Sequence, residues 1–121
     1  MDSFSLIVSD GHPVACYSEV PDNPRAIIQI AHGMGEHAKR YAWVAAQLAA
    51  QGYAVYASDH RGHGETAGEH LGYMGADGWN RCLADMYEIN RHLRQLHPNL
   101  PLCLLGHSMG SMLSQIGRAH V

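Results

Sequence analysis

Short apolar runs in this chain alternate with longer stretches in which apolar residues recur every three or four positions. The short runs are rich in β-branched and aromatic residues, which is typical of strands. They predict strands at residues 4–8, 14–20, 26–31, 53–57 and 101–105. The dipeptide Asp10-Gly11 separates the first two runs and favours a β-hairpin between them.

The longer stretches, residues 38–51 and 78–97, have the apolar period of helices. Gly52 follows the first and Pro98 follows the second, and both residue types commonly end helices. Strands and helices alternate from residue 26 onward, which predicts parallel pairing with right-handed crossovers. We therefore expect an α/β fold, a mainly parallel sheet flanked by helices.

Three glycine-rich segments each follow a predicted strand. They are HGMGEH at 32–37, SDHRGHGET at 58–66 and GHSMGS at 106–111. The carboxyl ends of parallel strands lie at one edge of a sheet, where ligands bind in open α/β folds. The sequence therefore predicts that all three segments converge on one site. The second belongs to a long loop, 58–77, of a length that is usually functional or disordered in a compact domain.

The third segment contains a serine flanked by glycines, Gly106-His107-Ser108-Met109-Gly110. A serine on a sharp strand-to-helix turn has its hydroxyl exposed at a helix N-terminus, and the crowded turn requires small neighbours. The helix dipole and the Met109 amide could then stabilise a negative oxygen on a substrate. Ser108 is therefore a candidate nucleophile; the alternative is that it only caps the helix.

The first segment could supply a second amide. An oxyanion hole needs one N–H after the nucleophile and one from a loop that follows an earlier strand. Gly33 and Gly35 would let this backbone turn so that the Met34 amide points inward. The alternative is an ordinary glycine turn that leads into a helix.

Taken together, HGMGEH, SDHRGHGET and LLGHSMGS resemble the serine α/β-hydrolases of the monoacylglycerol lipase and lysophospholipase group, which are similar to serine aminopeptidases of the S33 type. The resemblance extends over residues 25–114. It implies an α/β-hydrolase fold and hydrolysis of monoacylglycerol or lysophospholipid esters through an acyl-enzyme. It implies a small amphipathic ester as substrate, and neither a cofactor nor a metal.

The resemblance also implies roles for individual residues. Ser108 would be the nucleophile, and the amides of Met34 and Met109 would form the oxyanion hole. Supporting residues of the motifs would be His32, Gly33, Gly35, Glu36, His37, Asp59, Arg61, Gly62, His63, Gly64, Gly106, His107 and Gly110. We expect the charges of Glu36, Asp59 and Arg61 to be structural, forming ion pairs or binding backbone amides, rather than to react.

The family pattern is incomplete in this chain. In this fold the triad order is Ser, then Asp or Glu, then His. No Asp or Glu follows Ser108, and His120 is the only histidine after it. We therefore interpret residues 1–115 as the N-terminal part of a hydrolase domain whose acid, base, cap and later strands lie elsewhere. Alternatives are another esterase, a thioesterase or a peptidase on the same fold, an inactive fragment, and a binding protein that keeps only the pocket.

The last six residues, IGRAHV, break the small and apolar pattern of the helix that begins at the serine. They also match a translated sequencing adapter. We expect residues 116–121 to be a non-native tail.

Composition narrows the partners and the compartment. The net charge of −3 argues against nucleic acid, which requires a clustered positive surface. The three cysteines are widely spaced and odd in number, so they suggest a reducing compartment and no disulfide framework. The ten histidines have no metal-ligand spacing, so we expect no metal site. A start without a leader and the lack of a long apolar stretch predict a cytoplasmic protein without a stable membrane anchor; the oligomeric state is not indicated.

Overall fold

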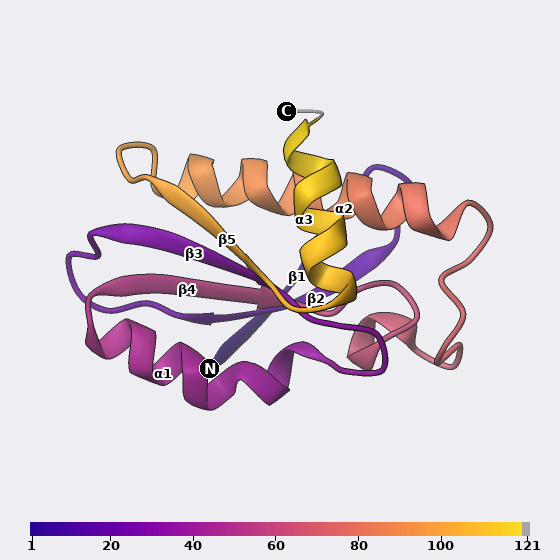
Figure 1. Cartoon of the computed structure of the whole chain (residues 1–121), viewed down its shortest axis with the longest axis horizontal. Helices are drawn as coiled ribbons and strands as arrows, with labels where there is room; N and C mark the ends of the chain where they lie inside the picture. The colour runs from indigo at the N-terminus through magenta and orange to yellow at the C-terminus, as the bar shows by residue number, and fades with distance from the viewer. Residues whose placement is uncertain (120–121) are drawn as a thin grey trace.

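The computed structural model describes residues 1–119, and these residues form a five-stranded sheet with helices on both faces (Figure 1). The strands are β1 (Asp2–Ile7), β2 (Pro13–Glu19), β3 (Ala26–Ala31), β4 (Tyr53–Ser58) and β5 (Leu102–Gly106). The helices are η1 (Ala38–Tyr41), α1 (Ala42–Ala50), η2 (Gly64–Ala67), α2 (Gly78–Leu96) and α3 (Met109–Ala119), of which η1 and η2 are single 3-10 turns.

The spatial order of the strands is β1-β2-β4-β3-β5. Strand β3 pairs in parallel with both β4 and β5, as the alternation of strands and helices predicted. Strands β1 and β2 form the predicted antiparallel hairpin, and β2 joins the rest of the sheet by antiparallel pairing with β4. The sheet is therefore mixed: a parallel centre with a hairpin at one edge. This confirms the predicted α/β class.

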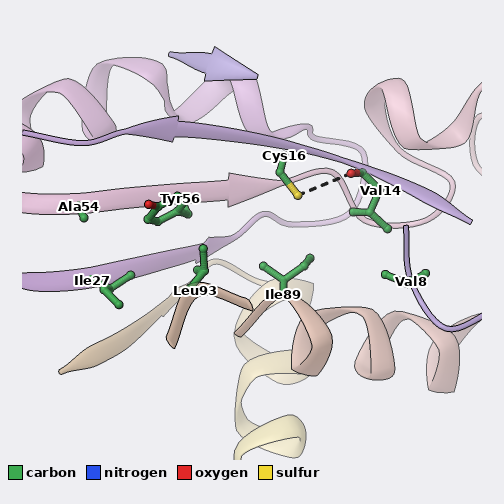
Figure 2. Packing of buried hydrophobic residues seen from close by; sticks show 8 residues of the cluster. All are labelled: Val8, Val14, Cys16, Ile27, Ala54, Tyr56, Ile89 and Leu93. Atoms are coloured by element: carbon green, nitrogen blue, oxygen red, sulfur yellow. Dashed lines mark hydrogen bonds between the residues drawn. The ribbon is translucent and has the colours of Figure 1, made fainter. Parts of the chain in front are cut away.

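Successive side chains of β4 point to opposite faces, and each face has its own core. Ala54 and Tyr56 belong to a cluster with Ile89 and Leu93 of α2, whose inward orientation Figure 2 shows. The alternate residues of β4, Val55 and Ala57, pack instead against Ala45 of α1 on the other face. This strict alternation is the period of a strand buried on both faces. The two helix layers therefore hold the sheet between them.

The carboxyl ends of β3, β4 and β5 come together beneath the first turn of α3 (Figure 1). A third cluster of buried residues lies there, in which Ala31 of β3 packs against Met86 of α2 and Met109 and Leu113 of α3. The three glycine-rich segments all leave the sheet at this edge. The predicted convergence is confirmed.

One local prediction needs correction. The helix expected from residue 38 begins with the 3-10 turn η1 and becomes α-helical only at Ala42. The loop 58–77, expected from its length to be either functional or disordered, is ordered in part: η2 lies within it and residues 59–63 are buried. Side-chain contacts with β2 and α2, described below, bury this segment.

No helix in residues 1–119 has the length and apolar character needed to cross a bilayer. Helix α3 continues through the first part of the expected tail, residues 116–119, and residues 120–121 of that tail lie outside the described residues.

Candidate active site

Ser108 lies at the junction of β5 and α3 in a left-handed backbone conformation, with φ of +55°. Such a conformation is uncommon for a residue with a Cβ and costs about 1–3 kcal/mol. The Ser108 carbonyl accepts the first bonds of α3, from the N–H of Ser111 at 2.9 Å and of Met112 at 3.2 Å. The side chain of Ser108 is exposed. The turn thus presents the hydroxyl to solvent at a helix N-terminus.

The two glycines of this turn are required by contact. A Cβ on Gly106 would lie 2.6 Å from the carbonyl oxygen of Gly110. A Cβ on Gly110 would overlap the carbonyl of Ala31 and lie 2.6 Å from the carbonyl oxygen of His32. The turn is joined to β3 by a hydrogen bond from the His107 N–H to the Ala31 oxygen, at 3.1 Å. The serine is therefore held directly against the end of β3.

The loop after β3 orients the second amide. The Gly33 carbonyl accepts a hydrogen bond from Nδ1 of His32 at 2.7 Å. Because the Gly33–Met34 peptide is trans, its N–H points opposite to that carbonyl and away from His32. Gly35 has a φ of +76°, which lets the loop turn outward at this point. Within residues 1–119, no protein atom accepts a hydrogen bond from the N–H of Met34 or Met109.

His32 is itself held by the segment after β4. The N–H of His60 donates to Nε2 of His32 at 3.0 Å, which leaves Nδ1 as the protonated nitrogen that reaches Gly33. In return, Nε2 of His60 donates to the carbonyl of His32 at 2.9 Å. Burial lowers the pKa of His32 and lowers that of His60 to about 3, so both rings are neutral. His63 lies beside His32, with ring centroids 5.1 Å apart.

Asp59 organises the start of the same segment. Its carboxylate accepts the N–H of Ala38 at 2.7 Å, the N–H of Glu65 at 2.9 Å and the hydroxyl of Tyr17 at 3.4 Å. Gly64 passes so close that a Cβ there would overlap this carboxylate. Asp59 is only 2% exposed. It joins η1, η2 and β2 beneath the site.

Arg61 joins the same segment to the hairpin and to α2. Its guanidinium donates to Asp85 at 2.6 and 3.0 Å and to Asp10 at 2.7 Å through each of two nitrogens. These hydrogen bonds raise the pKa of Arg61 and hold that of Asp10 well below its usual range. The next residue, Gly62, has a φ of +76° and would clash with the backbone of Tyr73 if it carried a side chain.

Glu36 belongs to the loop after β3, and its side chain lies between Gly33 of that loop and the serine turn. Its Oε1 accepts the N–H of Gly33 at 2.8 Å, the hydroxyl of Tyr41 at 2.9 Å and Nδ1 of His107 at 3.0 Å. The Gly33 bond is the main reason that the pKa of Glu36 falls to about 2. His37, in contrast, is exposed, and in the described part of the chain its side chain makes no hydrogen bond.

Within residues 1–119, the hydroxyl of Ser108 has no hydrogen-bond partner, so the structure pairs it with neither a base nor an acid. His107, its neighbour in sequence, points to Glu36 instead. His32, His60 and His63 are buried, and each donates a hydrogen bond from a ring nitrogen to a backbone carbonyl. The arrangement combines an exposed serine and two unbonded N–H groups with a buried, hydrogen-bonded network of side chains beneath them.

Residues 22–116, which include all three motifs, match the family described as serine aminopeptidase, S33. The chain belongs to the serine aminopeptidase S33 family. Among its relatives is a monoacylglycerol lipase of Mycolicibacterium smegmatis, 42% identical over 74% of this chain and 31% of that protein. The human monoglyceride lipase is 34% identical over 90% of this chain and 35% of that protein. The chain thus spans about a third of the length of these relatives.

Solved structures agree with the family assignment. A thermostable carboxyl esterase from Bacillus coagulans, in complex with glycerol, superposes with a TM-score of 0.90 and is 33% identical. The superposition extends over 98% of this S33 chain and over 39% of the esterase. A monoglyceride lipase from Saccharomyces cerevisiae, in complex with a substrate analogue, has a TM-score of 0.73 and 26% identity, over 90% of this chain and 36% of that structure. The α/β-hydrolase fold is therefore confirmed.

Sequence reasoning missed two contributions to the site of this S33 chain. His60 was not among the expected residues, although its ring and its N–H both bind His32. The contact of His107 with Glu36 was also unforeseen, since 71 positions separate the two residues. The position of His60 two residues after the buried strand β4 was the only local signal for its burial, and no local signal existed for the second contact.

Proposed function

We propose that the complete protein to which these residues belong hydrolyses carboxylic esters of monoacylglycerols, with Ser108 as nucleophile. The carrying observation is the strained serine turn at φ +55°, held against the loop that bears the Met34 amide. Relatives named as monoacylglycerol and monoglyceride lipases support this substrate class. Because the chain spans only part of those relatives, the activity is proposed for the complete protein.

In the proposed reaction, the hydroxyl oxygen of Ser108 attacks the ester carbonyl and its proton passes to a histidine base. The carbonyl π bond breaks, and the resulting oxyanion is stabilised by the amides of Met34 and Met109. When the tetrahedral intermediate collapses, the glycerol oxygen leaves with the proton, and an acyl-enzyme remains. Water then attacks the acyl group by the same steps and releases the fatty acid. We propose that the base and its orienting acid come from residues of the complete protein that lie outside these 121 residues.

The domain limits are part of the same proposal. Residues 1–115 would belong to the hydrolase domain, and residues 116–121 would be non-native. Sequencing the gene past the codon for Ser114 tests this: an open frame that encodes an Asp and then a His supports it, and a stop after Val121 contradicts it.

The three cysteines are free, and Cys103 is exposed, which supports a reducing, cytoplasmic location.

Hydrolysis by the complete protein tests the proposed substrate class. We would measure kcat/KM for a monoacylglycerol, a lysophospholipid, an acyl thioester and an aminoacyl anilide, each with wild type and Ser108→Ala. The proposal predicts the highest value for the monoacylglycerol and no turnover in the variant. A preference for the anilide or the thioester would instead assign a peptidase or thioesterase to the same site. Equal rates in wild type and variant would remove Ser108 from the mechanism.

A further inference from the structure

We propose that Glu36 is a positioning residue that fixes the loop after β3 to the serine turn, and thereby sets the distance between the Met34 and Met109 amides. This inference rests on the proposed function, since it concerns the amides that would hold the oxyanion. It assigns to Glu36 an effect on the rate of reaction rather than only on folding.

The contacts of a single oxygen carry the proposal. Oε1 of Glu36 accepts hydrogen bonds from three different segments: the Gly33 N–H in the loop, the Tyr41 hydroxyl in η1 and Nδ1 of His107 in the serine turn. All three distances lie between 2.8 and 3.0 Å. The residue thus adds a side-chain connection beyond the paired ends of β3 and β5, where a single backbone bond, from the His107 N–H to the Ala31 oxygen, joins the serine turn to β3.

The packing around Gly33 shows how closely the two segments meet. A Cβ on Gly33 would lie 2.9 Å from Oε1 of Glu36 and 3.2 Å from both Nδ1 and the carbonyl oxygen of His107. The loop can therefore approach the serine turn only because Gly33 lacks a side chain. Glu36 fills the remaining polar space and gives the N–H of Gly33 and the ring of His107 a common acceptor.

Glu36 can make strong bonds there because it is charged and sheltered. Its side chain is 15% exposed, and its second oxygen lies 3.8 Å from Nε of Arg40. The bond from Gly33 first, and those from His107 and Tyr41 after it, outweigh the effect of burial on its pKa. Hydrogen bonds to an ionised carboxylate are shorter and stronger than neutral ones. A neutral amide in its place would keep the shape and weaken all three bonds.

The consequence for the reaction follows from the location of the two amides. Met34 lies in the loop and Met109 at the start of α3, so their separation depends on how these segments are joined. An oxyanion forms only during the reaction, so an altered separation weakens transition-state binding more than substrate binding. Loss of Glu36 should therefore lower kcat and leave KM nearly unchanged.

The test uses the complete protein and four variants: Glu36→Gln, His107→Ala, His107→Asn and, as matched control, Arg40→Gln. Arg40 also faces Glu36, but from solvent and through the other oxygen, so its loss should leave kcat unchanged. Glu36→Gln is expected to lower kcat about 10-fold, less than the roughly 100-fold or greater loss on removing an oxyanion-hole donor. His107→Ala should lower kcat similarly. Asparagine, which places a donor near the position of Nδ1, should restore most of it.

The double variant Glu36→Gln/His107→Ala should be no slower than either single variant, because both remove the same connection. Three results would overturn the proposal: an unchanged kcat in Glu36→Gln, an equal loss in Arg40→Gln, or His107→Asn as slow as His107→Ala. A loss of kcat that only tracks a lower thermal midpoint would also overturn it, since that is a folding defect. Wild type without esterase activity is a separate outcome; it refutes the proposed function and leaves Glu36 no reaction to assist.

Discussion

A methyl group added at Gly110 is expected to destabilise the fold, because α3 begins in direct contact with β3. The added Cβ would lie 2.5 Å from the carbonyl carbon of Ala31 and 2.6 Å from the carbonyl oxygen of His32. Carbon contacts normally lie at about 3.5 Å or more, so the first turn of α3 must move by roughly 1 Å. Both partners are backbone atoms at the end of β3, an interior strand of the sheet, and neither can rotate away.

The size of the effect follows from what this movement disturbs. Displacing α3 weakens the bond from the His107 N–H to Ala31 and loosens Met109 and Leu113, which are buried against α2 and β3. Overpacking costs about 1–3 kcal/mol and a lost backbone bond about 1 kcal/mol. Alanine regains about 1 kcal/mol of helix propensity. We therefore expect Gly110→Ala to lower the free energy of unfolding by about 2 kcal/mol.

The assay is urea unfolding of the 121-residue chain, followed by circular dichroism. Gly117→Ala is the matched control, since Gly117 lies in the same helix and a Cβ there meets no atom within 4 Å. This control should be as stable as wild type or more stable, by up to about 1 kcal/mol. If Gly110→Ala were as stable as Gly117→Ala, the close contact between α3 and β3 would be refuted.

Three further predictions concern the carboxylates that support the site, and the serine itself. Asp59→Asn should lower the free energy of unfolding by about 1–3 kcal/mol, because one of the two backbone N–H groups that it binds loses its acceptor; an unchanged urea midpoint would contradict this. The pKa of Glu36 is lower in the folded state, at about 2, than its ordinary 4.5. The stability that Glu36 contributes should therefore be present above pH 4.5 and lost as the pH falls toward 2, and Glu36→Gln should flatten that loss in acid titrations; an identical acid slope in both proteins would refute the assigned shift. The 121-residue chain alone should not hydrolyse p-nitrophenyl acetate above background, since no base contacts Ser108 in residues 1–119; turnover that disappears in Ser108→Ala would show that an upstream histidine serves as base.

Local patterns were sufficient for the strands and for α2, but not for the two 3-10 turns. The run at residues 26–31 is apolar and rich in isoleucine except at Gln29, as is typical of a buried parallel strand, and the structure places β3 there with the same limits. Helix α2 follows from the spacing of its apolar residues and ends just before Pro98. Because three glycine-rich segments followed three such strands, their meeting at one edge was also predictable.

The supports of the site were not predictable, because they depend on contacts between residues far apart in the sequence. Arg61 binds Asp10 and Asp85, which lie 51 and 24 positions away in opposite directions. The ion pairs of its guanidinium help to explain why residues 59–63 are buried, although apolar residues do not recur there at the spacing of a helix or a strand. The sequence indicated that the charges in these motifs are structural, but their partners emerge only when the hairpin and α2 pack against the loop.

The measurement that tests the central claim most directly is labelling of the complete protein with a fluorophosphonate probe, followed by peptide mass spectrometry. The probe reacts only with a serine whose base and oxyanion hole are assembled. We predict one labelled residue, Ser108, and that labelling is slowed by excess monoacylglycerol and abolished in Ser108→Ala. Absence of label, or label on another serine, would contradict the assignment of Ser108 as the nucleophile.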